Sequence, residues 1–176
     1  GIAVCNVRGY AANSVPEHVL MMILALRRNL FDYRQDVQRG LWNQSKQFCL
    51  LTHELHDIRN STLGIVGFGS IGKSMARLGE SVGMRVLIAE RKNAIETRDG
   101  RTSFDETLRQ SDVISLHCPL TDETRDLIGR DELETMKRNA LLINTARGAL
   151  IDNAAVINAL RSNLIAGAGV DVLRQR

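Results

Sequence analysis

The chain has 176 residues, of which 44% are hydrophobic and 24% charged, and this composition is typical of one ordinary globular domain. The net charge is only +3, the basic residues are scattered and aromatic residues make up 4% of the chain, so we expect no nucleic-acid partner. No apolar run approaches the roughly 18 residues of a membrane-spanning helix, so we expect no membrane partner either.

The three cysteines, Cys5, Cys49 and Cys118, show no C-x-x-C spacing. This pattern predicts free thiols in a reducing compartment, with no zinc site or other metal centre. No signal peptide is visible, so we expect a cytoplasmic protein. The chain opens on an apolar run, residues 2–6, that predicts a strand, and it ends directly after another predicted strand, which indicates a piece of a longer protein.

A long helix is predicted to begin at Ser14 and to run to about Gly40. Ser14 and Glu17 form a capping box with Pro16 in the first turn, and apolar residues follow at helical spacing, namely Val19, Met22, Ile23 and Leu26. We expect this helix to pack in the core or in a dimer interface. His18, in the first turn, is expected to be solvated or to cap the helix rather than to act in catalysis.

Residues 41–60 show no clear period but contain four apolar side chains, those of Trp42, Phe48, Leu50 and Leu51. Two interpretations stay open: an arm that wraps a neighbouring subunit, or a loop that covers its own domain. His53 and His56 lie in this stretch without ligand-like spacing to other residues, so they predict no metal site.

The next stretch contains three glycines, Gly67, Gly69 and Gly72, in the spacing G-x-G-x-x-G. They follow the apolar strand predicted at residues 62–66 and open a helix predicted from about Ile71. Gly67 permits a sharp turn, Gly69 lets the backbone approach a pyrophosphate, and Gly72 lets the helix pack close to the strand. The helix N-terminus then offers free N–H groups to phosphates. The alternative is a glycine-rich turn that merely packs a helix on a sheet.

Glu90 ends the next predicted strand, residues 85–89, about 18 residues after Gly72. A dinucleotide site has an acidic residue near this place, which accepts hydrogen bonds from the ribose hydroxyls. The motif and this carboxylate together predict a dinucleotide site that prefers NAD, because Glu90 would repel the 2′-phosphate of NADP. Arg91 and Lys92 weaken this preference, since either can turn toward a phosphate.

Helices and strands alternate through the rest of the chain. Residues 91–101 read as a loop, Ser103 caps a helix at 104–110, and Asp152 caps another at 154–161. A short helix at 131–136 and apolar strands at 112–117, 140–145 and 165–171 complete the pattern. It predicts an α/β fold with a doubly wound parallel sheet and helices on both faces. Ligands bind such sheets at the carboxyl ends of the strands, here Gly67–Gly72, Glu90, His117–Pro119, Thr145–Gly148 and Asp171.

Four of these strand-end residues are candidates for chemistry. Arg147 can hold a substrate carboxylate and polarise the adjacent carbonyl, or it is a solvated or structurally paired arginine. His117 can act as an acid–base group, although we favour a role in supporting the loop that follows. Cys118 is expected to line a pocket rather than to act as a nucleophile, because no recognisable motif places a base beside it. Asp171 either accepts from the carboxamide of a nicotinamide or simply ends its strand.

Residues 67–72, 117–121, 144–148 and 169–172 together resemble the D-isomer-specific 2-hydroxyacid dehydrogenases, and the resemblance covers essentially the whole chain. Residues 89–92 and 115–121 look most like the glycerate dehydrogenase, or hydroxypyruvate reductase, branch. The resemblance implies a Rossmann-type fold, NAD as cofactor and hydride transfer between the nicotinamide and a 2-oxo or 2-hydroxy acid. It also implies roles for individual residues: Ser70 and Ile71 at the pyrophosphate, Glu90 at the ribose, Cys118 and Pro119 in the cofactor cleft, Thr145, Ala146 and Asp171 at the nicotinamide end, and Arg147 as the catalytic, substrate-binding arginine.

The resemblance further implies that residues 1–176 are an NAD(P)-binding domain, with a long helix and arm at 14–60 and a dinucleotide-binding core at 61–176. The substrate domain and the catalytic His would lie outside the chain, and Arg176 stands where the family usually has Glu. We therefore expect a homodimer, formed through residues 14–60, and no activity of this chain alone. The alternative is a non-enzymatic NAD-sensing module of the co-repressor type, against which the placement of Arg147 argues.

Overall fold

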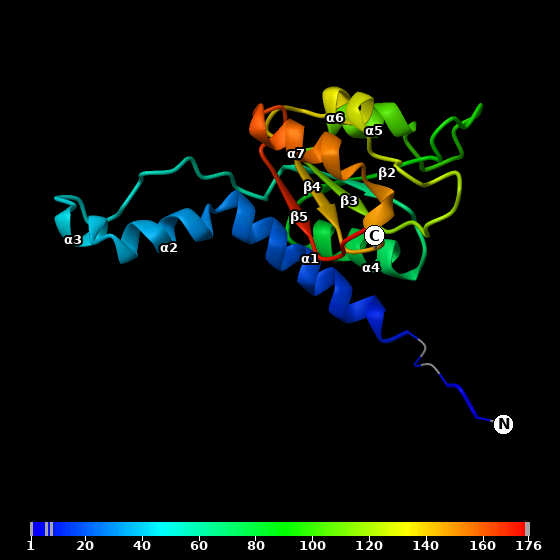
Figure 1. Ribbon diagram of the computed structural model, residues 1–176, viewed down its shortest axis with the longest axis horizontal. Coiled ribbons are helices and arrows are strands. Elements are labelled where there is room, and N and C mark those ends of the chain that lie inside the picture. The colour runs from blue at the N-terminus through cyan, green and yellow to red at the C-terminus, as the bar shows by residue number, and fades with distance from the viewer. Residues whose placement is uncertain (1, 6, 8, 175–176) are drawn as a thin grey trace.

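The computed structural model describes residues 2–5, 7 and 9–174. Its centre is one sheet of five parallel strands in the order β2-β1-β3-β4-β5 (Figure 1). The strands are β1 (Thr62–Val66), β2 (Arg85–Ile88), β3 (Val113–Leu116), β4 (Leu141–Asn144) and β5 (Gly167–Val170). Every residue of β1, β3 and β4 is buried, because both faces of the sheet are covered, and this explains their near-continuous apolar sequences.

A single residue extends the sheet beyond β2. Thr102 pairs in parallel with Ala89: its N–H donates to the Ile88 carbonyl at 2.9 Å, and its carbonyl accepts from the Glu90 N–H at 2.7 Å. Thr102 lies between β2 and β3 in the chain. Counted as a minimal strand, it gives the order 3-2-1-4-5-6 of the doubly wound dinucleotide-binding sheet. The fold class expected from the sequence is therefore confirmed.

Helices cover both faces of the sheet (Figure 1). On one face lie α1 (Ala11–Arg27) and α4 (Ser70–Ser81), and on the other lie α5 (Phe104–Gln110), α6 (Arg130–Thr135) and α7 (Asn153–Arg161). Each layer has its own hydrophobic core: Val19, Ile23 and Met75 are fully buried in the first, and Leu133, Leu142 and Leu150 in the second. The two caps predicted for the second layer are present. Ser103 Oγ accepts from the Glu106 N–H at 3.3 Å, and Asp152 Oδ1 accepts from the Ala154 N–H at 2.9 Å.

The N-terminal predictions are wrong in two respects. Residues 2–5 form no strand, and Asn6 lies outside the described residues. The first helix begins at Ala11, and Ser14 does not cap it: its Oγ donates to the Tyr10 carbonyl at 3.3 Å, inside a helix that also accommodates Pro16. The expected packing of this helix in the core is confirmed, because Val19 and Ile23 are fully buried.

The long helix also breaks near its middle, after Arg27. Asn29 takes a left-handed φ of 48°, and a second helix, α2 (Leu30–Gln38), follows, with α3 (Leu41–Gln44) beyond it. The returning chain contacts α1 and Asn29 at the break. Asn29 Nδ2 donates to the Glu54 carbonyl at 2.5 Å, and the His56 N–H donates to the Arg27 carbonyl at 3.0 Å. The sequence could not show this contact, because its partners are more than 20 residues apart.

We define residues 30–60 as the arm, which projects from the body of the molecule in Figure 1. Asp36 links α2 to the segment that returns toward the sheet. Its carboxylate accepts from Thr52 Oγ1 at 2.6 Å and pairs with His53 Nε2 at 2.8 Å. The His53 ring also meets the ring of Tyr33 edge to face. The segment after α3 therefore packs back against α2. Six large apolar side chains of the arm stay exposed, those of Leu30, Phe31, Val37, Trp42, Phe48 and Leu51.

The first prediction compares two glycines of the β1–α4 turn. Gly72→Ala is expected to lower the free energy of unfolding by about 1–3 kcal/mol, because the added methyl group would overlap the Gly67 carbonyl oxygen. Gly69→Ala is the matched control. Its methyl group would meet open space at a φ of −78°, so we expect a change within about 0.5 kcal/mol. Urea denaturation measures both, and equal losses would contradict the close packing at Gly72.

Candidate functional site

The carboxyl ends of all five strands meet at one edge of the sheet, where the sequence places its candidate residues. The turn after β1 lies next to the turn after β3, and these two strands flank the point where the strand order reverses. Such a switch point is where open α/β sheets bind ligands. The predicted residues are thus brought to one edge by the topology alone.

The glycine turn has the geometry that its spacing predicts. Gly67 has a φ of +97°, and a Cβ there would overlap the backbone N of Cys118. Gly72 packs against the Gly67 carbonyl, whereas nothing lies within 4 Å of the Cβ position of Gly69. Ser70 and Ile71 open α4, with Ser70 exposed. The first turn of α4 therefore presents its N–H groups to open space beside Gly69.

A cavity of about 380 Å³ adjoins this turn, between the ends of β1, β2 and β3. Apolar groups form part of its wall, including Phe68, Phe104 and Leu127, and Cys118 and Pro119 form part of the side next to β3. Its charged side chains are Glu90, Arg91, Lys92, Arg98, Arg101 and Glu123. The cavity is thus lined by apolar side chains and by an excess of cationic over anionic side chains.

Glu90 is the buried acid of this cavity, with a side chain only 4% exposed. Arg98 donates from Nε to Oε2 at 2.7 Å and from Nη2 to Oε1 at 2.5 Å. The N–H groups of Arg91 and Arg98 donate to the two oxygens as well, at 2.8 and 3.3 Å. These bonds, those from Arg98 above all, lower the pKa of Glu90 to about 2, so it is ionised at neutral pH. Sequence reasoning named Glu90 but missed Arg98, which lies in a loop without any motif.

His117 and Cys118 follow β3 and are held in uncharged forms. His117 Nε2 lies 2.9 Å from Ser115 Oγ, and burial lowers the pKa of His117 to about 4. Burial also raises the pKa of the Cys118 thiol. A neutral imidazole and a neutral thiol are poor choices for an acid and a nucleophile at neutral pH. These environments support the structural interpretations of both residues.

The turn after β4 carries Arg147, and the buried side chain of Asn144 shapes it. Asn144 Nδ2 donates to the Arg147 carbonyl at 2.9 Å, and Asn144 Oδ1 accepts from the Ala146 N–H at 3.1 Å. The exposed Arg147 guanidinium donates to the Ala146 carbonyl at 2.7 Å. Thr145 Oγ1 is buried and has no hydrogen-bond partner among the described residues. Asn144 was not singled out from the sequence, although a buried amide at a strand end is a usable signal.

Asp171 follows β5 and has a partner that the sequence did not predict. His18 Nε2, in α1, lies 3.3 Å from Asp171 Oδ1, and both side chains are about half exposed. The Asp171 N–H donates to the Asn144 carbonyl at 3.1 Å. The expectation that His18 merely caps its helix or faces solvent is therefore incomplete, because α1 brings it to the strand-end edge. Arg176 lies outside the described residues.

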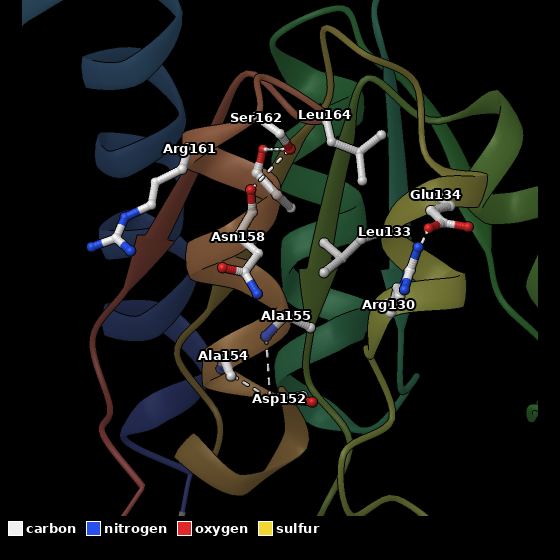
Figure 2. Close-up of a pocket in the computed structure, with 11 residues that line it drawn as sticks. Arg130, Leu133, Glu134, Asp152, Ala154, Ala155, Asn158, Arg161, Ser162 and Leu164 are labelled. Atoms are coloured by element: carbon white, nitrogen blue, oxygen red, sulfur yellow. Dashed lines mark hydrogen bonds and ion pairs between the residues drawn. The ribbon is translucent and has the colours of Figure 1, made fainter.

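A second cavity, of about 650 Å³, lies between α6 and α7 (Figure 2). No predicted site residue lines it. Three of its charged side chains have partners within the chain: Arg130 Nε donates to Glu134 Oε1 at 2.8 Å, and Asp152 caps α7. Elsewhere in the described ranges, no cluster of three His, Cys, Asp or Glu residues is suited to a metal ion. None of the described helices is long and apolar enough to cross a bilayer.

The lowered pKa of His117 predicts that the fold loses stability in mild acid. The folded chain keeps this ring neutral down to about pH 4, whereas in the unfolded chain it protonates near its ordinary value of 6.5. Between these values the unfolded state binds more protons, so the free energy of unfolding falls as the pH is lowered from about 6.5 to about 4. His117→Gln should flatten this part of the profile in urea denaturation at successive pH values.

His56→Gln is the control for this measurement, because His56 is partly exposed and pairs with the exposed Glu54. That variant should keep the slope of the original chain. A proton NMR titration of His117 with a midpoint near 6.5 would contradict the prediction.

Comparison with known proteins shows the family of the chain. Residues 20–176 match the family model of the D-isomer specific 2-hydroxyacid dehydrogenase, NAD binding domain. The glycerate dehydrogenase of Methylorubrum extorquens is 50% identical over 175 residues, which are 99% of this chain and 54% of that protein. A putative 2-hydroxyacid dehydrogenase of Haemophilus influenzae is 47% identical over 173 residues, 98% of this chain and 55% of that protein. The chain thus spans about half the length of these relatives.

Solved structures give the same result. A crystal structure of D-lactate dehydrogenase with NAD⁺ from Lactobacillus jensenii matches with a TM-score of 0.82 and 32% identity, over 99% of this chain and 52% of that one. A protein of Thermus thermophilus matches with a TM-score of 0.84 and 38% identity, over 98% of this chain and 54% of that one. The alternative of a non-enzymatic sensing module gains no support from these matches. The chain belongs to the D-isomer-specific 2-hydroxyacid dehydrogenase family, as an NAD-binding domain.

Proposed function

We propose that this chain is the cofactor-binding half of an enzyme that transfers a hydride between NAD(H) and a small 2-hydroxy or 2-oxo acid, such as D-glycerate and hydroxypyruvate. One observation carries the proposal. The glycine turn, the Glu90 cavity and the exposed Arg147 all follow the carboxyl ends of strands at one edge of the sheet. The similarity to a glycerate dehydrogenase supports this substrate class.

The residues at this edge fit a dinucleotide. Open space beside Gly69 leaves room for a pyrophosphate at the N-terminus of α4, where Ser70 and Ile71 would contact it. Thr145 Oγ1, buried without a partner among the described residues, offers a hydroxyl to the nicotinamide end. We assign Ala146 and Asp171 to the same end, Cys118 and Pro119 to the wall of the cleft, and Glu90 to the region of the ribose.

The bound NAD(H) would supply or receive the hydride, and the residues of this chain would hold the substrate. The Arg147 guanidinium can bind the carboxylate of a 2-oxo acid and stabilise the charge that develops on the adjacent carbonyl oxygen. A proton must reach the same oxygen. His117 is neutral and bonded to Ser115, so we assign proton transfer to a residue outside this chain. The free thiols of this chain support a reducing, cytoplasmic location.

The mechanism predicts the effect of removing Arg147 from the full-length enzyme. Arg147→Ala should lower kcat/KM for hydroxypyruvate by about 100-fold or more, on the scale of losing one oxyanion donor. Arg147→Lys should restore little, because an ammonium group lacks the planar fork that fits a carboxylate. The affinity for NAD should change little, since the pyrophosphate and ribose contacts lie elsewhere. Steady-state oxidation of NADH measures the first two effects, and calorimetry measures the third.

The isolated 176-residue chain is the control, and it should bind NAD without turnover. A near-normal kcat/KM for the Arg147→Ala enzyme would remove Arg147 from the mechanism. Turnover by the isolated chain would place the proton-transferring group inside it, and His117 would then be the first residue to test.

The arm supports a further part of the proposal, a homodimer formed through residues 14–60. Phe31, Trp42 and Phe48 are exposed by 59%, 50% and 97%, although the arm is held in shape by Asp36 and His53. Apolar side chains on a firmly held projection indicate contact with another surface. A two-fold interface would let the arm of each copy lie on the body of the other.

Sedimentation at micromolar concentration should therefore show a dimer, and Phe31→Glu should shift it toward the monomer by placing a charge in the apolar contact. Ile95→Glu is the matched control, because Ile95 is a fully exposed apolar residue in the 91–101 loop, outside the arm. The control should remain a dimer. A monomer for the original chain would contradict the proposed interface.

A further inference from the structure

The Glu90 carboxylate has no vacant hydrogen-bonding position. A carboxylate offers about four lone-pair sites. Two are taken by the Arg98 guanidinium, at 2.7 and 2.5 Å, and two by the N–H groups of Arg91 and Arg98, at 2.8 and 3.3 Å. A ribose hydroxyl that bonded to Glu90 would have to displace or share one of these donors. The acceptor positions that a strand-end acid usually offers to the ribose are therefore already occupied here by donors of the chain itself.

The charge of Glu90 is neutralised as well. Its side chain is 4% exposed, and Arg98 lies over it as a bidentate partner whose own side chain is 57% exposed. From the cavity, a ligand would therefore meet the guanidinium together with the carboxylate. A buried acid discriminates against a phosphate by repulsion, and a cation in contact with that acid cancels most of the repulsion.

Other cations surround this pair. Four cationic and two anionic side chains line the cavity, so positive charge is in excess there. Arg101 Nη1 donates to the Ala89 carbonyl at 3.1 Å, and its guanidinium lies 5.3 Å from the centre of the Phe68 ring. Lys92 Nζ pairs with Glu132 Oε1 at 2.7 Å. Glu132 thus neutralises Lys92, and the cavity keeps a small excess of positive charge, with Arg101 held in position for an additional phosphate.

We propose that Arg98 is a specificity-determining residue, which pairs with Glu90 and thereby lets this site accept NADP(H) as well as NAD(H). The proposal rests on the assignment of the cofactor to this edge of the sheet. It differs from the expectation drawn from Glu90 alone, in which the acid repels the 2′-phosphate. With Arg98 in place, the affinities of the chain for NAD and NADP differ by no more than about tenfold, equivalent to one weak charge interaction.

The test is a calorimetric titration of the 176-residue chain with NAD and with NADP. In Arg98→Ala, Glu90 keeps two backbone donors but regains its uncompensated charge and two free lone pairs. The affinity for NADP should fall about tenfold or more, while that for NAD holds or rises. Glu90→Gln should act in the opposite direction, because the Arg98 guanidinium then faces the cavity without its carboxylate, so NADP should bind more tightly than in the original chain.

Arg161→Ala is the matched control, since it removes the same charge from an exposed position on α7, away from this cavity. Its ratio of NAD to NADP affinity should equal that of the original chain. Circular dichroism checks that each variant is folded, and Arg98→Gln replaces Arg98→Ala if the shorter side chain disturbs the loop.

The outcomes separate the two proposals. If the original chain binds neither cofactor, the proposed function fails. If it binds NAD but prefers it over NADP by more than about tenfold, or if Arg98→Ala and Glu90→Gln leave the ratio unchanged, the role of Arg98 is overturned while the proposed function stands. If Arg98→Ala lowers the affinities for NAD and NADP equally, Arg98 only stabilises its loop, which also overturns the inference.

Discussion

The close contact between two backbone segments at the end of β1 is the constraint on which the site depends. Gly67 turns with a positive φ against the backbone of Cys118, and Gly72 lets α4 rest on the Gly67 carbonyl. A side chain at either position would push α4 away from the sheet or β1 away from the turn after β3. The same contact leaves Gly69 and the first turn of α4 facing open space. Packing that is required for the fold therefore also creates the place where a phosphate can approach the backbone.

The polar groups of the site follow from the burial of the sheet. Strands buried on both faces have no room for charges, so ionisable groups collect at the strand ends, where each one needs a partner. Glu90 pairs with Arg98, His117 hydrogen-bonds with Ser115, and Asp171 pairs with His18. The three pairs have different consequences, because Glu90 stays ionised, His117 stays neutral, and Asp171 remains half exposed to a ligand. Burial and partner, rather than residue type alone, thus determine what each group can do.

The sequence predicted the sheet, the helical layers and the glycine turn because their signals are local. Ser103 and Asp152 cap their helices as expected, and the motif after β1 fixes its own turn. The predictions failed where distant contacts decide. The predicted long helix breaks at Asn29 because the chain returns at Glu54, and His18 reaches Asp171 only through the packing of α1. The sequence did not indicate Arg98 for the same reason. An arginine in a loop carries no motif, and its role depends on its contact with the Glu90 carboxylate.

The proposed role of Arg147 assigns a specific task to this half of the enzyme. A guanidinium has five N–H donors, and among the described residues that of Arg147 uses one, at the Ala146 carbonyl. Asn144 fixes the backbone on both sides of the turn, so the remaining donors are directed from a firm base although the side chain is exposed. A carboxylate bound there would be held from one side only, by the charge and the planar N–H groups of the guanidinium. These groups do not contact the rest of the substrate. Under the proposed function, recognition of the 2-oxo acid group would fall to this half of the enzyme, and discrimination between longer and shorter acids would require contacts from the opposite side of the substrate.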